Sequence, residues 1–427
     1  MMYLISLGLR SLLYRKNQYA ALLLVCLVGV GVSLFSIFLI RGMLFSLESK
    51  ARIYYGGDFQ FIGGKNTLAF DNASEFIEQL RDVFGENAVI SERFDCDAKN
   101  SALYFEGVGV RQRVIKGVDF NTEKRLFNAF NYVAGNAENI AGTNGILLSE
   151  PIAELLGAGM GDEVTLMMRT GAGYLNTMTL VVKGIFRDSS LFGMYTSYMD
   201  IDFLRKVYGV PQSWANRIAI DFQGKIPKTK EEYQSLLEKK FNMFCLVEDK
   251  QLFYDPLLTG RLKEATYALT PLSANMQELK VLISAMEGIA SFVIITLIVI
   301  IVAGIGSTYR VLVMKRINEI GIYMAIGMKN SAIVVTILSE SLFLLLCGCI
   351  SGLLFAFLLC FLSSAVNFSF IPAFDIFLQN GHLLPLFDGK ATLLVWGVVI
   401  VLTVLAVLYS IQKTVRIMPV KALATTE

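Results

Sequence analysis

Four long apolar runs constrain this chain more than any other feature. Apart from Arg41 at the end of the first run and Glu340 inside the third, they carry no charge, and they cover residues 20–41, 288–309, 331–361 and 391–411. A helix needs about 20 apolar residues to cross a bilayer, whereas a barrel strand alternates over about 10 residues. The runs therefore predict four transmembrane helices. The first is too long for a signal peptide and is expected to stay as an anchor.

The segment between the first two runs has a different composition. Over the 427 residues, 54% are hydrophobic and 17% are charged, against about 45–50% and about 25% in soluble proteins. Residues 42–285, however, hold 26 Lys and Arg and 30 Asp and Glu, a net charge of −4. The composition argues against a wholly soluble enzyme and against a disordered chain. It predicts a soluble domain, residues 42–287, inserted between two membrane helices.

The inserted segment mixes short β-branched and aromatic runs with short amphipathic ones, which predicts an α+β domain rather than a repeated β-α-β fold. Expected strands cover Asp58–Ile62, Gly107–Val118, Glu163–Met168, Met178–Phe186 and Arg217–Phe222. Expected helices cover Ser74–Phe84, Ser149–Leu156, Ile201–Tyr208 and Lys230–Lys240. The second helix is the best marked, because Ser149 is a typical N-cap, Pro151 lies in the first turn and Gly157 follows the last turn.

Both ends of the inserted domain are expected to continue the neighbouring membrane helices as rigid stalks. Residues 41–52 contain no proline, and residues 272–287 place apolar side chains at helical spacing. Two anchors joined to the domain by ordinary linkers are the alternative.

Basic residues gather in three short segments, 1–19, 310–330 and 412–427. The ten are Arg10, Arg15, Lys16, Arg310, Lys315, Arg316, Lys329, Lys413, Arg416 and Lys421, against the acidic Glu319 and Glu427. The other short segment, 362–390, has Asp375 and Asp388 against Lys390. Short cytoplasmic segments are enriched in Lys and Arg. Both termini are therefore expected in the cytoplasm, with the inserted domain and residues 362–390 outside.

The sequence offers no set of side chains for catalysis or for binding a metal. His382 is the only histidine, no G-x-x-x-x-G-K-[ST] loop occurs, and the glycine-rich run at 157–162 follows a helix instead of a strand. Cys96 and Cys245 both lie in the inserted domain, and whether they pair stays open. We expect no enzyme activity, no metal and no cofactor held by this chain.

The third span carries two further signals. Glu340 is a carboxylate within a membrane segment, where ionisable side chains are functional candidates, and its isolation favours a structural or coupling role over a proton relay. Small residues recur at every fourth position, at Gly348, Gly352, Ala356 and Cys360. Such a stripe lets helices approach closely, within this chain or with another subunit.

The segment 310–330 is too polar at 315–319 for a span and too apolar afterwards for a solvated loop. An exposed apolar segment of this kind predicts a surface for a partner, and Gly327 is expected to end its helix. Residues 1–19 are expected to form an amphipathic helix on the cytoplasmic membrane surface.

Residues 315–327, Lys-Arg-Ile-Asn-Glu-Ile-Gly-Ile-Tyr-Met-Ala-Ile-Gly, resemble the K-R-x-x-E-I-G-I-x-x-A-I-G signature of FtsX/MacB-type ABC transporter permeases. Residues 416–423, Arg-Ile-Met-Pro-Val-Lys-Ala-Leu, are similar to the closing R-x-x-P-x-x-A-L of that family. Glu340 with its glycine stripe also resembles that family. In the inserted domain, so do Gly145–Glu150, Gly161–Val164 and Val182–Phe186. The resemblance covers nearly the whole chain except residues 223–275.

The resemblance implies a multi-pass protein of the bacterial inner membrane, with a MacB-like periplasmic core domain between helices 1 and 2 and a second permease subunit beside it, identical or different. It implies a separate cytoplasmic ATPase dimer that binds ATP and Mg, and no nucleic acid partner. Members are understood to be mechanotransmitters, which pass ATP-driven movement to the outer domains. The coupling residues implied are Lys315, Arg316, Glu319, Ile320, Gly321, Gly327, Pro419 and Leu423.

Three functions stay open at this point. Because no ATPase is fused to the chain, its layout is similar to that of the lipoprotein-releasing LolC/LolE permeases, which would also imply a lipoprotein substrate and a periplasmic chaperone. Export of peptides or drugs, as by MacB, and signalling to a cell-wall hydrolase, as by FtsX, are the alternatives. In the first case the expected lipid contacts are Phe35, Phe38, Leu39, Met43, Phe45, Ile289, Phe292 and Val293.

Overall fold

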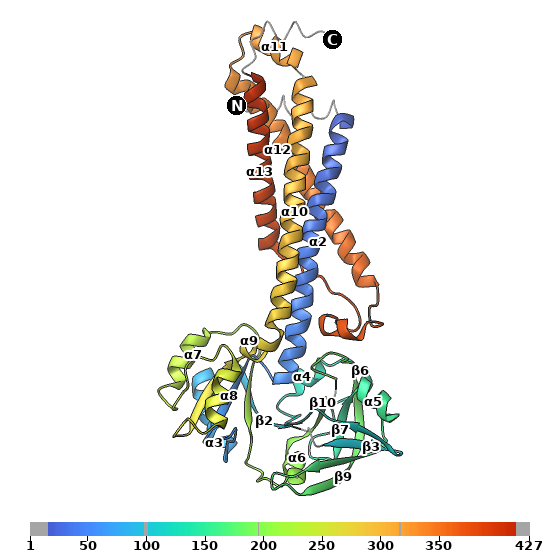
Figure 1. The fold of residues 1–427 in the computed structure, drawn as a ribbon, viewed down its shortest axis with the longest axis vertical. Helices are drawn as coiled ribbons and strands as arrows, with labels where there is room; N and C mark the ends of the chain where they lie inside the picture. The colour runs from blue at the N-terminus through green and yellow to red at the C-terminus, as the bar shows by residue number, and fades with distance from the viewer. Residues whose placement is uncertain (1–15, 98–100, 195, 316, 416–427) are drawn as a thin grey trace. The chain divides into compact units, whose positions relative to one another are not determined.

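The computed structural model describes residues 16–97, 101–194, 196–315 and 317–415 (Figure 1). The chain divides into two units. The helical unit comprises residues up to 44, residues 283–367 and residues from 382 onward. The inserted domain comprises residues 45–282 together with the short segment 368–381.

Within the described residues, four helices are long and apolar enough to cross a membrane, as the sequence predicts: α2 (Lys16–Tyr55), α10 (Gln277–Lys315), α12 (Asn330–Ala365) and α13 (Gly389–Val415). A short helix, α11 (Ile317–Ala325), lies between α10 and α12 in the sequence. The helix α2 continues well past the apolar run that predicted it, through the first expected stalk. The predicted helix at residues 1–19 lies mostly outside the described residues.

The small residues of α12 face α2. A Cβ atom added to Gly348 would lie 2.5 Å from the Cβ of Cys26, and one added to Gly352 would lie 2.9 Å from the Cβ of Val30. Ala356 is fully buried and Cys360 is half-buried. Because glycine has no side chain at these two positions, the backbones of α2 and α12 approach closely.

The chain that leads into α13 is also fixed to α2. The backbone N–H of Leu386 donates to the carbonyl of Phe38 over 2.9 Å. The ring of Phe38 lies 5.4 Å from that of Phe387 and 6.1 Å from that of Phe357 on α12. These three aromatic side chains close one end of the helical core.

Replacing Gly352 by alanine is expected to lower the stability of the helical unit by about 1–3 kcal/mol, because the added methyl group overpacks the contact with α2. Gly397→Ala on α13 is the matched control, since a Cβ there meets nothing within 4 Å. Unfolding of the purified chain in mixed micelles measures both. Equal effects of the two substitutions would contradict the close α2–α12 contact.

The inserted domain is an α+β domain built on a twelve-stranded sheet. Eleven strands run in the order β12-β1-β11-β2-β5-β10-β7-β9-β8-β3-β4, and β6 pairs with β9. Most pairs are antiparallel, but β5 with β10 and β7 with β9 are parallel. The strands are β1 (Phe59–Gly64), β2 (Ala88–Asp97), β3 (Ala102–Phe105), β4 (Val108–Arg111), β5 (Val114–Val118), β6 (Tyr132–Gly135), β7 (Gly145–Ser149), β8 (Glu163–Arg169), β9 (Leu175–Phe186), β10 (Thr196–Asp200), β11 (Arg217–Phe222) and β12 (Thr266–Pro271).

Short helices cover the sheet and create separate cores. One core lies under α3 and α7 and contains Phe61, Phe222 and Tyr233, and another lies under α5 and α6. The helices of the domain are α3 (Ala73–Phe84), α4 (Lys124–Asn128), α5 (Glu150–Leu156), α6 (Ile201–Tyr208), α7 (Lys230–Leu237), α8 (Lys250–Leu258), α9 (Leu272–Asn275) and the 3-10 helix η1 (Pro372–Phe377).

Two elements that the sequence predicts as continuous are each divided in the structure. The single strand expected at Gly107–Val118 is two strands, because β4 pairs with β3 at the sheet edge whereas β5 pairs with β2 and β10 in the middle. The helix expected at Leu272–Glu287 is interrupted at Met276, between α9 and α10. Local spacing identified strand and helix residues but could not locate these breaks. The first break follows from strand pairing elsewhere in the domain.

The predicted ends of α5 are confirmed, but one expected capping contact is not formed. Ser149 is at the N-cap of α5 and Gly157 adopts the left-handed conformation at its end, but the Ser149 hydroxyl makes no capping hydrogen bond. Cys96 is buried, Cys245 is exposed, and no disulfide joins them. Residues 223–275, which resemble nothing recognised in the sequence, supply α7, α8 and the edge strand β12.

Part of the segment 362–390, expected to be a short outer loop, belongs to the inserted domain. Residues 368–381 contain η1, and its Asp375 accepts hydrogen bonds from Lys50 Nζ on α2 over 2.8 Å and from the backbone N–H of Ser189 over 2.9 Å. Lys50 and Asp375 are far apart in the sequence, and the ionic contact between them therefore fixes this segment.

A charged collar surrounds the last turn of α2 within the inserted domain. Arg93 on β2 donates from Nη1 to the carbonyl of Tyr54 over 2.9 Å and from Nη2 to the carbonyl of Ile53 over 3.1 Å. Its guanidinium also forms an ion pair with Glu123, which accepts from the Ser91 hydroxyl over 2.7 Å. Carbonyls at a helix end have no partner within the helix, so Arg93 supplies both the hydrogen bonds and a favourable positive charge.

Further charges complete the collar. Arg52 donates to Asp58 and Asp221 over 2.7 Å in each case, which joins α2 to the start of β1 and to β11. The ammonium group of Lys116 on β5 lies 3.9 Å from the ring centroid of Tyr54. Burial lowers the pKa of Lys116 to about 8, although Asp95 opposes that change. Strands from the middle of the sheet therefore converge on one helical turn.

Glu123→Gln is expected to lower the free energy of unfolding of the inserted domain by about 3–5 kcal/mol, because it leaves the Arg93 charge without its partner inside the protein. Arg93 and Glu123 are 0% and 2% exposed. Asp82→Asn is the control, because Asp82 forms an exposed pair with Lys240 that is worth about 1 kcal/mol or less. Thermal unfolding of the full chain, followed through the β-sheet signal, compares them; similar shifts would contradict the role of the collar.

Candidate functional site

The helix α11 occupies the segment that the sequence marks as a partner surface. Gly327, with a φ of +86°, ends it in the left-handed conformation. The backbone N–H groups of Gly327 and Met328 donate to the carbonyls of Met324 and Tyr323 over 3.0 and 2.9 Å. Ile320 and Gly321 are buried, whereas Ile322 is 53% exposed. One face of α11 is therefore packed, and another presents apolar side chains.

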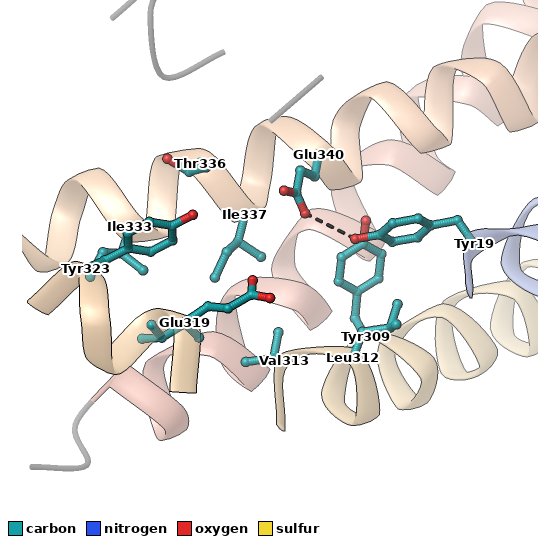
Figure 2. A pocket seen from close by; sticks show the side chains of 11 residues that line it. Tyr19, Tyr309, Leu312, Val313, Glu319, Tyr323, Ile333, Thr336, Ile337 and Glu340 are labelled. Atoms are coloured by element: carbon teal, nitrogen blue, oxygen red, sulfur yellow. Dashed lines mark hydrogen bonds between the residues drawn. The ribbon is translucent and has the colours of Figure 1, made fainter. Parts of the chain in front are cut away.

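A small pocket lies behind the packed face of α11 (Figure 2). It has a volume of about 50 Å³, enough for a few water molecules, since one needs roughly 10–15 Å³. Side chains from α2, α10, α11 and α12 meet in it. Its lining residues are Tyr19, Tyr309, Leu312, Val313, Glu319, Ile320, Tyr323, Ile333, Thr336, Ile337 and Glu340.

Two carboxylates face this pocket. Glu340 of α12 is 1% exposed and accepts a hydrogen bond of 3.2 Å from the Tyr19 hydroxyl on α2. Glu319 of α11 points into the same space from the other side (Figure 2). The pocket thus brings together the two acidic residues that the sequence singled out separately. Its carboxylates and phenols can form hydrogen bonds between helices, as Tyr19 and Glu340 do.

The remaining predicted coupling residues have different positions. Lys315 is exposed at the end of α10, and Ile320, Gly321 and Gly327 belong to α11 or its terminating turn. Arg316, Pro419 and Leu423 lie outside the described residues.

The predicted lipid contacts separate into two groups. Phe38 and Met43 are buried, and Phe35 and Leu39 are partly buried, so they mainly pack within the chain. Four side chains are exposed and stay available for lipid or another subunit: Phe45 at 49%, Ile289 at 67%, Phe292 at 72% and Val293 at 36%.

Sequence reasoning missed the tyrosines of the pocket. Tyr19, Tyr309 and Tyr323 were not selected, because tyrosine is common near the ends of membrane helices. A usable signal was present, since all three lie close to the ends of apolar runs on the side that also carries Glu319. Within the described residues, no group of three or more potential metal-ligating side chains is present.

Comparison with known families is consistent with this arrangement. Residues 291–419 match the family model described as FtsX-like permease C-terminal. The matched region contains most of α10, all of α11 and α12, and α13. Among curated proteins, none matches the chain significantly.

The match supports the FtsX/MacB/Lol class of permeases and, with the four apolar helices, a multi-pass membrane protein. Proteins of this class are transmembrane subunits of ABC transporters, generally not enzymes themselves, and work with ATPase partners. The family model thus supports an ABC transporter permease subunit.

Tyr19→Phe is expected to destabilise the helical unit by about 0.5–1.5 kcal/mol, because it removes the hydroxyl that donates to Glu340 and retains the ring. Tyr409→Phe on α13 is the control, since Tyr409 is 69% exposed. Unfolding in mixed micelles measures the two variants against the unmodified chain. A loss no larger for Tyr19→Phe than for Tyr409→Phe would contradict the importance of this hydrogen bond.

Proposed function

We propose that this chain is the membrane subunit of an ABC transporter that works by mechanotransmission and releases lipoproteins from the outer leaflet of the bacterial inner membrane. A separate cytoplasmic ATPase dimer supplies ATP and Mg, and a second permease subunit completes the membrane part. The observation that carries the transporter assignment is the match of residues 291–419 to FtsX-like permeases. Both termini and α11 are then cytoplasmic, and the inserted domain is outside.

The position of α11 supports its role as the surface for the ATPase. Ile322 is 53% exposed on α11, a helix too short to span a bilayer, and Ile326, in the turn that follows the helix, is 74% exposed. Exposed apolar side chains of this kind are stabilised by a partner. On the opposite face, Glu319 reaches the pocket that α2, α10 and α12 share. A displacement of α11 would therefore act directly on three spans.

The proposed movement leaves the membrane through α2. This helix is continuous from Lys16 to Tyr55, and bending it would break backbone hydrogen bonds. Its last turn is fixed by the charged collar to β1, β2, β5 and β11. A shift of α2 would move these strands with it.

The choice of lipoprotein as substrate rests on exposed apolar side chains. Ile289, Phe292 and Val293 lie on α10, and Phe45 lies on α2. Acyl chains gain free energy by contact with apolar surface, at about 0.8 kcal/mol per buried CH₂ group. The same surface accepts other apolar molecules, so substrate competition is the decisive measurement.

The experiment is purification of the tagged chain with its ATPase from detergent, followed by reconstitution into lipid. ATP hydrolysis is measured with a triacylated lipoprotein, with the same protein lacking its acyl chains, or with a hydrophobic drug. Stimulation by the acylated form alone is expected. Stimulation by the drug alone favours export, and stimulation by neither, with capture of a cell-wall hydrolase, favours signalling; either outcome overturns lipoprotein release.

Two substitutions test the coupling surface in the same assay. Glu319→Gln removes a pocket carboxylate, and Gly327→Ala strains a left-handed position by about 1–2 kcal/mol. Both are expected to abolish stimulation while membrane insertion and basal hydrolysis persist. Asp82→Asn and Gly397→Ala are the matched controls and should behave as the unmodified chain. Normal stimulation in both coupling variants would show that α11 is misassigned.

A further inference from the structure

The inserted domain contains a cavity whose charged side chains the proposed transport mechanism does not use, although Phe45 in its wall is also one of the proposed lipid contacts. It has a volume of about 350 Å³ and lies between the outer part of α2, the segment 129–131, the end of β9 and the segment 368–381. This volume is typical of a small-molecule site. The lining residues include the charged side chains Lys50, Arg187, Asp188 and Asp375.

The charges in this cavity do not balance. Arg187 is neutralised by Glu150, to which its Nε and Nη2 atoms donate over 3.0 and 3.3 Å. Lys50 forms ion pairs with both cavity carboxylates, with Nζ 3.5 Å from Asp188 and 2.8 Å from Asp375. Arg187 also attracts Asp375 electrostatically, but its own charge is matched by that of Glu150. One negative charge remains in excess, on side chains that are only 8% and 10% exposed.

The two carboxylates also keep unused acceptor atoms. Asp188 Oδ1 accepts from the backbone N–H of Ser190, and Asp375 Oδ2 accepts from that of Ser189. No donor among the described residues bonds to the other oxygen of either group. Burial is the main cause that raises the pKa of Asp188, with Lys50 opposing it. The excess negative charge is thus held at a cost that a bound cation would reduce.

A second feature of the cavity also lacks a partner. Ser46 on α2 is fully buried and lines the cavity, and its hydroxyl has no hydrogen-bond partner among the described residues. A buried hydroxyl without a partner is unfavourable. Ser46 therefore adds an unpartnered polar side chain to the wall of the cavity.

The walls of the cavity are aromatic and apolar. Phe45, Tyr54, Phe130 and Tyr198 line it, and the rings of Phe130 and Tyr198 lie 5.6 Å apart. Aromatic faces attract cations and pack against apolar groups. A divalent metal ion fits less well, because Lys50 already lies between the two carboxylates and no third carboxylate, His or Cys joins them within the described chain.

From this combination we infer that the cavity binds an organic cation, an ammonium or guanidinium group carried on an apolar stem, such as a basic side chain of a peptide. The cationic head bonds to the free oxygens of Asp188 and Asp375, and the stem packs against Phe130 and Tyr54. The inference concerns the inserted domain and does not depend on which substrate the transporter moves.

The test uses benzylamine as the probe, titrated calorimetrically into the full chain in detergent, with detergent alone as the blank. Benzyl alcohol has the same shape without the charge, and benzoate has the opposite charge. Benzylamine is expected to bind at least tenfold more tightly than benzyl alcohol, and benzoate is expected not to bind. Equal binding of benzylamine and benzyl alcohol would overturn the inference.

Variants locate the binding. Asp375→Asn should weaken benzylamine binding at least tenfold, whereas Asp82→Asn, the exposed control, should leave it unchanged. Lys50→Met removes the resident ammonium and is expected to tighten benzylamine binding at least tenfold, with a rise in melting temperature on addition of the probe. Misfolding would weaken binding, so tighter binding in this variant shows that the substitution acts through the charge of the cavity. Binding that is insensitive to both Asp375→Asn and Lys50→Met would place it elsewhere and overturn the assignment.

Discussion

The end of α2 depends on a buried guanidinium. A helix end inside a protein must find partners for its last carbonyls, and here Arg93 reaches those of Ile53 and Tyr54 while Glu123 balances its charge. Because neither charge is exposed, each requires the other, and together they set where the helix stops and where β2 lies. Arg52 and Lys116, the other charged residues of the collar, form further contacts between this end of α2 and the neighbouring strands. The last turn of α2 is thus held within the inserted domain by charged side chains.

In the helical unit, the contact between α2 and the small residues of α12 depends on close packing and not on charged side chains. Gly348 and Gly352 let α12 approach α2 closely, so dispersion contacts replace the hydrophobic effect that is absent between helices in lipid. The pocket behind α11 gathers Glu319, Glu340 and Tyr19, and the Tyr19 hydroxyl donates to Glu340. Buried polar groups are costly unless they are bonded. In the proposed function, α11 binds an ATPase with one face and contacts this pocket with the other, which is the physical basis of the proposed coupling.

Much of the architecture could be predicted from the sequence, and each incorrect or missing prediction has a specific physical cause. The spans were predictable because about 20 uncharged residues have few other stable environments, and α6 and β11 were predictable because caps and alternation mark them locally. The break within Gly107–Val118 was not, because it depends on which distant strands pair with β4 and β5. The interruption at Met276, between α9 and α10, leaves no signal in the helical spacing. The two carboxylates of the pocket were both selected, but Tyr19 was not, since only folding brings α2 beside α12. The pairing of Lys50 with Asp375 likewise could not be predicted, because more than 300 positions separate the two residues.

The sequence by itself determined the number of spans, the insertion of an α+β domain between the first two, and the motif at 315–327 that resembles FtsX/MacB-type permeases. These properties depend on hydropathy and on spacing within a few helical turns, which neighbouring residues set. Only the tertiary structure decided that Glu319 and Glu340 share one pocket, that Arg93 closes α2, and that Lys50, Asp188 and Asp375 form a cavity with an excess negative charge. The physical reason is that buried polar groups are stabilised by partners distant in sequence, and the energy of such a contact depends on geometry that composition and periodicity do not contain.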